Sequence, residues 1–481
     1  MLLLDITVVN TALPAIQEDL DASFTDLQGV VDAYTLTLAA FTLSAGSLAD
    51  RIGRRRVFTW GLAIFTLSSL ACALAPTATA LNIARAFQGV GGAVMFAVSL
   101  ALIAQEFRGR DLGTATGLYG ATIGGAVAIG PLVGGALTDG LGWESIFYLN
   151  VPIGIAAIWL TARQLRESRD PEARGVDWIG TFTFSTSLLA LVLALLRGNA
   201  DGWGSTNIVL LLAGALVLFV LFVVSQTRVR EPMLPLALFR IPSFAGVQIG
   251  AFAVAGSQFA LFLYITLYLQ NVLGHTPLEA GVRYLPITLA SFFVAPVAGQ
   301  LMGRIGARYL IGGGLALAGL GLILMSGVEE GDTWTTLLGG FLVGGVGIGL
   351  LNPPTAAVAV QVVERAQSGM AAGINNTFRQ VGIAVGIAAY GALFLDRAES
   401  EISERVQVGD AHGIAEAVSS GNLPRGPEQV VRAAREGFFA GFNEILLIGG
   451  GLALAGAVAA VLLVRPQDIR HEGEPAMAVA A

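Results

Sequence analysis

The sequence contains no lysine, a single cysteine and three histidines, and these absences exclude several kinds of site. Without lysine the phosphate-binding pattern Gly-x-x-x-x-Gly-Lys-Ser/Thr cannot occur, so ATP hydrolysis through that motif is excluded. The same counts exclude a disulfide framework and a Cys/His metal site, and we predict neither a metal nor a cofactor. Because His275, His412 and His471 all fall in predicted loops or in the C-terminal tail, we expect no enzymatic activity.

Charged residues are also scarce. They make up 13% of the 481 residues, whereas 54% are hydrophobic and the mean hydropathy is +0.72. With the 62 glycines added, the apolar share is about two-thirds, against roughly 45–50% in soluble domains. This composition predicts an all-α polytopic membrane protein.

A membrane-spanning helix needs about 20 mostly apolar residues. With that window the sequence predicts 14 transmembrane helices, of which the first is short, because residues 1–16 supply only part of a span. We therefore expect further residues upstream of Met1. The predicted spans are centred near residues 9, 37, 66, 92, 125, 153, 187, 215, 257, 292, 318, 346, 380 and 451.

Arginine is distributed unevenly among the predicted loops. If the basic turn at 51–56 is cytoplasmic, arginines also occupy the other connections on that side, at 106–112, 163–177, 228–243, 304–309 and 364–368 and after 464. The short loops of the opposite side contain none: 17–26, 75–80, 139–142, 271–278 and 329–333. Positive residues favour the cytoplasmic face, so we predict a multi-pass protein of the inner or plasma membrane with both termini cytoplasmic.

The predicted spans divide into two sets of six with an additional pair between them. Residues 1–163 form an N-terminal bundle, 164–243 contain the pair (178–197 and 205–225) with linkers, and 244–464 form a C-terminal bundle. A weak echo of the basic turn at 299–308 suggests an internal repeat. Residues 465–481 are a cytoplasmic tail. The polar segment 395–437 is an external loop, in which short amphipathic helices and a disordered linker remain alternatives.

The most distinctive stretch is Gly46-Ser-Leu-Ala-Asp-Arg-Ile-Gly-Arg-Arg-Arg56, a dense polar turn between two apolar runs. Its glycines are expected to let the helix ends approach closely, and Asp50 lies among cations that hold it ionised. A solvated basic turn that only sets topology is the alternative. The residues that we single out in this turn are Gly46, Asp50, Arg51, Gly53, Arg54 and Arg55.

We single out four charged residues within predicted spans, where burial of charge is costly and usually serves function: Asp5, Asp32, Arg85 and Arg379. Each also has a structural interpretation. Asp5 can be an interfacial helix N-terminal residue, Asp32 a rim residue, and Arg85 an arginine bonded to helix carbonyls. For Arg379, packing between the two halves is an equal alternative.

The fifth predicted span contains Gly130, Pro131, Gly134 and Gly135. Small residues at this spacing let another helix pack closely, and Pro131 removes one helical hydrogen bond and permits a kink. A plain packing helix is the alternative interpretation.

Together, the motifs at 4–14, 46–56, 85–92 and 130–135 resemble, in the same order, those of the fourteen-span drug:proton antiporter family of the major facilitator superfamily. The run 369–382 resembles that family's span 13. The resemblance implies the major facilitator fold, with two six-helix bundles plus two extra central helices. It also implies proton-coupled export of amphipathic drugs, antibiotics or other small organic compounds by alternating access.

The resemblance also assigns roles to residues. It places Asp5, Asp32, Arg85 and Arg379 in proton coupling or the substrate cavity, and makes the basic turn a conformational latch. It makes Gly130, Pro131, Gly134 and Gly135 the antiporter motif between the halves. The partners implied are a small-molecule substrate, protons and membrane lipid, without nucleic acid, and the chain is expected to be monomeric. Residues 282–302 lack an acidic residue, so a preference for dications is not expected.

Two other classes of function compete with this one. A facilitator-type importer or symporter of a small organic solute would share the fold, but the Gly-Pro motif argues against it. A membrane-bound enzyme or sensor would need a cluster of catalytic side chains that the sequence does not contain.

Overall fold

The computed structural model describes residues 1–106, 122, 126, 129–167, 177–229, 232–363, 368–406, 411–419 and 427–469. These residues form helices and connecting segments without strands, which confirms the all-α fold class. The first half contains α1 (Leu2–Leu20), α2 (Phe24–Ile52), α3 (Arg54–Ala73), α4 (Ala78–Glu106), a helical segment at 129–141, α6 (Ser145–Tyr148) and α7 (Asn150–Gln164).

The second half begins with one long helix made of α10 (Pro242–Val254), η2 (Ala255–Phe259), α11 (Ala260–Leu267) and η3 (Tyr268–Val272), in which η2 and η3 are π-helical turns. It continues with α12 (Pro277–Arg283), α13 (Leu285–Ile305), α14 (Ala307–Met325), α15 (Leu338–Gln361), α16 (Ser368–Arg405), α17 (Ala411–Ser419) and α18 (Glu428–Leu463). Short 3₁₀ turns are η1 (Leu236–Arg240), η4 (Trp334–Leu337) and η6 (Pro466–Asp468).

Local sequence explains several of the helix boundaries. A capping box starts α2, because the Ser23 hydroxyl accepts from the Asp26 backbone N–H while the Asp26 carboxylate accepts from that of Ser23. Thr276 and Glu279 form the same arrangement at the start of α12. Gly53 separates α2 from α3 with a φ of 126°, a conformation that favours glycine.

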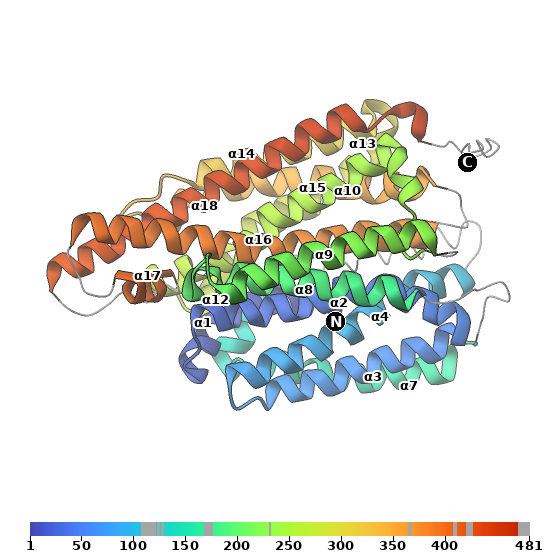
Figure 1. Ribbon diagram of the computed structural model, residues 1–481, viewed down its shortest axis with the longest axis horizontal. Helices are drawn as coiled ribbons and strands as arrows, with labels where there is room; N and C mark the ends of the chain where they lie inside the picture. Colours follow the sequence, from blue (N-terminus) through green and yellow to red (C-terminus); the bar gives the residue numbers. More distant parts are fainter. Residues whose placement is uncertain are drawn as a thin grey trace.

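Helices occupy both segments of the predicted additional pair: α8 (Trp178–Asp201) and α9 (Thr206–Arg228). α8 packs against α2 of the first half and α16 of the second, and α9 packs on α8 (Figure 1). Leu188 and Val192 of α8 are buried in an apolar cluster with residues of both these helices. The pair therefore lies against the junction of the halves.

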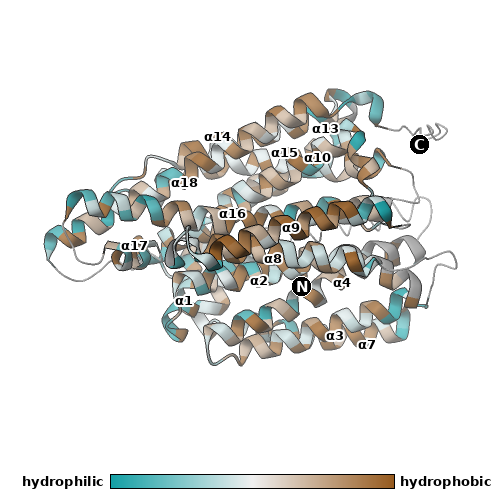
Figure 2. Ribbon diagram, viewed as in Figure 1, coloured by the Kyte–Doolittle hydropathy of each residue, from teal (hydrophilic) through white to brown (hydrophobic). Residues whose placement is uncertain are grey.

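Eleven helices among the described residues are long and apolar enough to cross a membrane. Hydrophobic residues predominate along these helices in Figure 2, and many of their large apolar side chains are exposed. α1 and α2 occupy predicted span positions but are not among these eleven, and most of the predicted fifth span lies outside the described residues. A polytopic membrane fold is thus supported, while the count of 14 stays a prediction.

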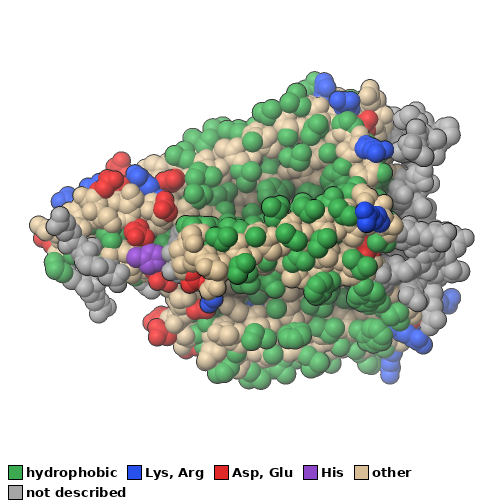
Figure 3. Space-filling model, viewed as in Figure 1, with side chains coloured by type: hydrophobic (Ala, Val, Ile, Leu, Met, Phe, Trp, Pro, Cys, Tyr) green, Lys and Arg blue, Asp and Glu red, His purple; other side chains and the backbone are tan. Residues whose placement is uncertain are grey.

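The segment 395–437 is largely helical where it is described. Its first residues continue α16 and its last residues begin α18, so two of its helices are extensions of predicted spans. The short helix α17 lies between them. Arg405 pairs with Glu401 and Glu436, joining the two long extensions. In Figure 3 this end of the molecule carries many acidic side chains, whereas arginines dominate the opposite end.

The largest apolar cluster contains buried residues from both halves, among them Val8 and Leu27 of the first and Tyr264 and Phe442 of the second. Smaller clusters lie within single halves. Gln270 donates to the Thr11 carbonyl at 2.8 Å, and Asn271 donates to the Gln17 side chain at 3.3 Å. These contacts join the halves at the end that carries α17.

Candidate functional site

A buried ion pair links the first and fourth helices. The Arg85 Nη1 atom of α4 lies 2.6 Å from Oδ2 of Asp5 on α1, and both side chains are 1% exposed. Arg85 also donates from Nε to the Val30 carbonyl of α2 at 3.0 Å. The guanidinium therefore connects three helices and neutralises a carboxylate that burial would otherwise destabilise.

Polar side chains complete the environment of Asp5. Its Oδ1 atom accepts from the Gln88 amide at 3.0 Å and from the Asn150 amide at 2.9 Å. Gln88 in turn donates to the Ser69 hydroxyl at 2.8 Å and accepts from Arg85 at 2.6 Å. Three side-chain donors thus surround one carboxylate. We call Asp5, Arg85, Gln88, Ser69 and Asn150 the Asp5 cluster.

Aromatic rings enclose the guanidinium. The Arg85 Cζ atom lies 4.2 Å from the centroid of the Tyr34 ring and 5.8 Å from that of Phe147. A cation over an aromatic face is attracted to it, more strongly where water is excluded. The rings hold the permanent charge of Arg85 at a fixed place.

Asp32 differs sharply from Asp5. It is buried on α2 with 1% of its surface exposed, so it does not lie at an exposed rim. Neither of its carboxylate oxygens has a hydrogen-bond partner among the described residues. Burying a charge without a partner is costly. Asp5 and Asp32 thus differ: Asp5 is paired with Arg85, whereas Asp32 has no partner among the described residues.

Arg379 is half-buried on α16 and donates from Nη2 to the Asn352 side chain of α15 at 3.0 Å. Both helices belong to the second half. This bond ties Arg379 to its own half and does not bring it to the Asp5 cluster.

The basic turn is held by a residue that the sequence did not single out. Glu167, which follows α7, accepts from the Arg55 backbone N–H at 3.1 Å and lies 3.6 Å from Nε of Arg56. Arg55 also donates from Nη1 to the Leu165 carbonyl at 3.3 Å. Little in the sequence indicated this role of Glu167, because it is one of several charged residues in a long polar linker.

The other members of the predicted latch give a mixed result. A Cβ at Gly46 would meet nothing within 4 Å among the described residues, so these residues show no close packing there, whereas a Cβ at Gly53 would collide with Glu167. Arg54 opens α3. The side chains of Asp50 and Arg51 lie outside the described residues.

The four residues of the Gly-Pro motif lie in the helical segment 129–141. Cβ atoms at Gly130 and Gly134 would collide with Thr7 and Thr11 of α1, and one at Gly135 would collide with the Pro277 carbonyl of α12. A Cβ at Gly281 of α12 would in turn meet the Pro131 carbonyl. The motif therefore allows close backbone packing both within the first half and across to the second.

A valine at Gly134 is expected to lower the thermal stability of the detergent-solubilised protein. The added side chain must displace Thr11 or the Val8 carbonyl, which would lie 2.7 Å from its Cβ, and such overpacking costs about 1–3 kcal/mol. Gly140→Val is the matched control, because a Cβ at Gly140 meets nothing within 4 Å. Equal melting temperatures for the two variants would contradict the packing role.

No group of three or more His, Cys, Asp or Glu side chains that could hold a metal ion occurs within the described ranges. The single cysteine, Cys72, is buried beside Gln88, with its Sγ atom 3.7 Å from Oε1.

Residues 1–387 match the family model described as Major Facilitator Superfamily. The chain belongs to the Major Facilitator Superfamily. Its helical architecture, with the Asp5 cluster inside the first half, is thus the fold of a family of membrane transporters. The family resemblance and fold class predicted from the sequence are confirmed.

Curated relatives in the superfamily include the multidrug resistance protein Stp of Mycobacterium tuberculosis, 38% identical over 82% of this chain and 73% of that protein. The tetracenomycin C resistance and export protein of Streptomyces glaucescens is 32% identical over 96% of this chain and 89% of its own. Among solved structures, an inward-facing bacterial homologue of the human lysosomal transporter Spinster aligns over 98% of this chain and 96% of its own, with a TM-score of 0.66 and 17% identity. That likeness supports the fold alone.

Proposed function

We propose that this Major Facilitator Superfamily transporter exports amphipathic drugs, antibiotics or similar organic compounds in exchange for protons, by alternating access. The observation that carries the proposal is the pair of buried carboxylates in the first half: Asp5 is paired with Arg85, whereas Asp32 has no hydrogen-bond partner among the described residues. The names of its relatives, which are multidrug resistance and antibiotic export proteins, support the substrate class.

The two carboxylates suit different tasks. Asp5 is held by Arg85 and by two amides, so it suits a fixed structural role in the first half. Asp32 has no such partner among the described residues. The free energy of burying its side chain therefore depends on whether the carboxyl group carries a proton. A proton that binds Asp32 in one conformation and leaves in the other couples the gradient to the conformational change. Arg379 would supply a fixed charge on the second half.

The contacts between halves support an arrangement closed at the α17 end. Gln270, Asn271 and the Gly-Pro motif join α1 and its neighbours to the second half there. If that end is external, this conformation exposes the substrate path to the cytoplasm, and parting of these contacts opens it outward.

The orientation follows from the placement of arginine. We place the arginine-rich end of Figure 3 and both termini in the cytoplasm, and the segment 395–437 outside. A reporter enzyme that is active only outside the cytoplasm, fused after Asp410, is expected to be active. Activity of a cytoplasm-only reporter at the same position would reverse this topology.

We further propose that the basic turn is a cytoplasmic latch, with Glu167 holding Arg55 and Arg56 at the end of α7. Asp50→Asn removes one charge and little volume. Loss of transport with normal membrane insertion would support the latch, whereas unchanged transport would reduce the turn to a topology signal.

The experiment that tests the function is transport into proteoliposomes of known orientation under an imposed pH gradient. The substrates are a panel of amphipathic antibiotics and dyes that includes tetracenomycin C. Uphill movement away from the cytoplasmic face, abolished by a protonophore, is the expected result. Uphill movement toward the cytoplasmic face would instead identify an importer or symporter.

A further inference from the structure

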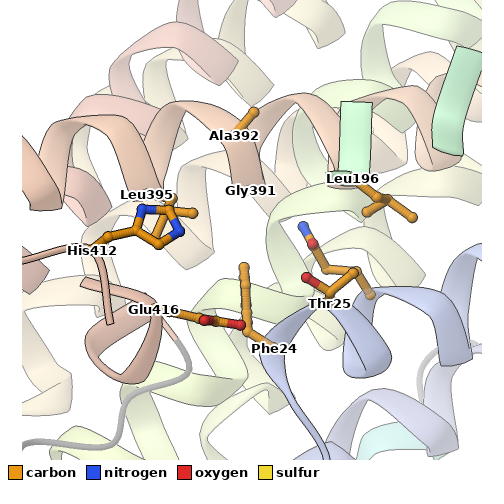
Figure 4. A pocket seen from close by; sticks show the side chains of 9 residues that line it. Phe24, Thr25, Leu196, Gly391, Ala392, Leu395, His412 and Glu416 are labelled. Carbon is orange, nitrogen blue, oxygen red and sulfur yellow. The ribbon is translucent and has the colours of Figure 1, made fainter. Parts of the chain in front are cut away.

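A small pocket lies under α17, at the end where the halves meet. Figure 4 shows it between α2, α16, α17 and the end of α8. Its rim carries His412 and Glu416 of α17, and Nδ1 of His412 lies 2.8 Å from Oε2 of Glu399. The floor is lined by Thr25 and Gln28 of α2 with apolar residues around them. The substrate and latch roles proposed above do not use this pocket.

Gln28 forms a hydrogen-bonded lock between the halves at the floor. Its Nε2 atom donates to the Ile387 carbonyl of α16 and to the Tyr264 hydroxyl of α11, both at 3.0 Å. The Tyr264 hydroxyl also donates to the Ile387 carbonyl, at 2.7 Å. Gln28 is 3% exposed, and its amide rests against Gly391, where a Cβ would collide with it. Any side chain larger than glycine at that position would displace the lock.

Asp32 lies one helical turn below the lock. Residues 28 and 32 are four apart on α2, so their side chains lie on the same helix face, as does Thr25 above them. The order from the surface inward is therefore the pocket, the Gln28–Tyr264–Ile387 lock, and the unpaired carboxylate.

We propose that the pocket under α17 is the external proton-access route to Asp32, and that Gln28 is the gate that closes it. This inference rests on the proposed proton-binding role of Asp32. Gln28 both lines the pocket and holds the lock, and Asp32 lies one helical turn further along α2. When the halves part at this end, Gln28 moves away from Tyr264 and Ile387, and Asp32 exchanges its proton with the outside.

The test is proton leak in the absence of any substrate. The full-length protein is reconstituted in known orientation with a pH-sensitive dye inside the vesicles, and the medium on the α17 side is acidified. Gln28→Ala removes two hydrogen bonds from the lock, so we expect about a tenfold faster leak than in the parent. Gly391→Ala, which displaces the amide and keeps Gln28, is expected to leak in the same way.

Two controls make the result specific. Leu196→Ala alters the pocket wall and leaves the lock intact, so its leak should equal that of the parent. Adding Asp32→Asn to Gln28→Ala should abolish the extra leak, because the route passes through that carboxylate. A parent-like leak in both folded lock variants, or a leak that survives Asp32→Asn, overturns the proposal. Because no substrate is present, failure of the parent to couple transport to protons is a separate result that concerns the proposed function.

Discussion

Replacing Arg85 with alanine is expected to cause a severe loss of stability together with loss of transport. The substitution leaves the Asp5 carboxylate buried without its counter-ion and removes the bonds to Val30 and Gln88. Breaking a buried pair from one side costs about 3–5 kcal/mol, because the remaining charge is uncompensated. The measurement is thermal unfolding of the solubilised protein beside a transport assay.

A double-mutant cycle separates the pair from its surroundings. Asp5→Asn combined with Arg85→Ala removes both charges, so the double variant should be less destabilised than the sum of the two single variants. Arg85→Lys should recover only part of the stability, since an ammonium lacks the planar fork that reaches Asp5, Gln88 and Val30 together. If the stability losses of the two single variants add up to that of the double variant, the ion pair is not the source of the destabilisation.

The sequence pointed to Asp5 and Arg85 because charge inside an apolar span is rare and costly. It did not point to Gln88 and Asn150, whose neutral amides are ordinary in sequence and gain meaning only when α4 and α7 pack against α1. The pairing of Asp5 with Arg85, 80 residues away, likewise depends on helix packing. The local sequence identifies charged residues whose burial is costly in free energy, whereas tertiary packing decides which opposite charges pair with one another.

Close approach between helices was predictable at some glycines and not at others. The Gly-Pro motif does pack tightly, but its contact with Pro277 of the second half could not be read from spacing within one helix. Gly46 has the same kind of sequence setting and no close neighbour among the described residues. For 395–437, charge spacing left short amphipathic helices and a disordered linker as alternatives. It did not show that helices in this segment continue α16 and α18, because a helix running past the membrane surface has no composition break at its own end.

Asp32→Asn is expected to abolish uphill export while leaving downhill exchange of substrate. The amide has the size of the acid and cannot release a proton, so the protein behaves as if permanently proton-loaded. A membrane potential of 100 mV contributes about 2.3 kcal/mol per proton, which sustains roughly fiftyfold accumulation of substrate by the parent protein. In the variant, the ratio of substrate concentrations across the membrane should fall to one. Efflux from proteoliposomes under an imposed pH gradient measures it.

Stability distinguishes this variant from changes in the Asp5 cluster. Asp32 makes no hydrogen bond to the described residues, so its replacement breaks none, and the melting temperature should stay near that of the parent. Asp5→Asn also should stop uphill export, but with a clear loss of stability, because it leaves Arg85 without its carboxylate. Parent-like accumulation by Asp32→Asn would move the proton site elsewhere, and Asp5 would then be the remaining acidic candidate among the residues singled out here.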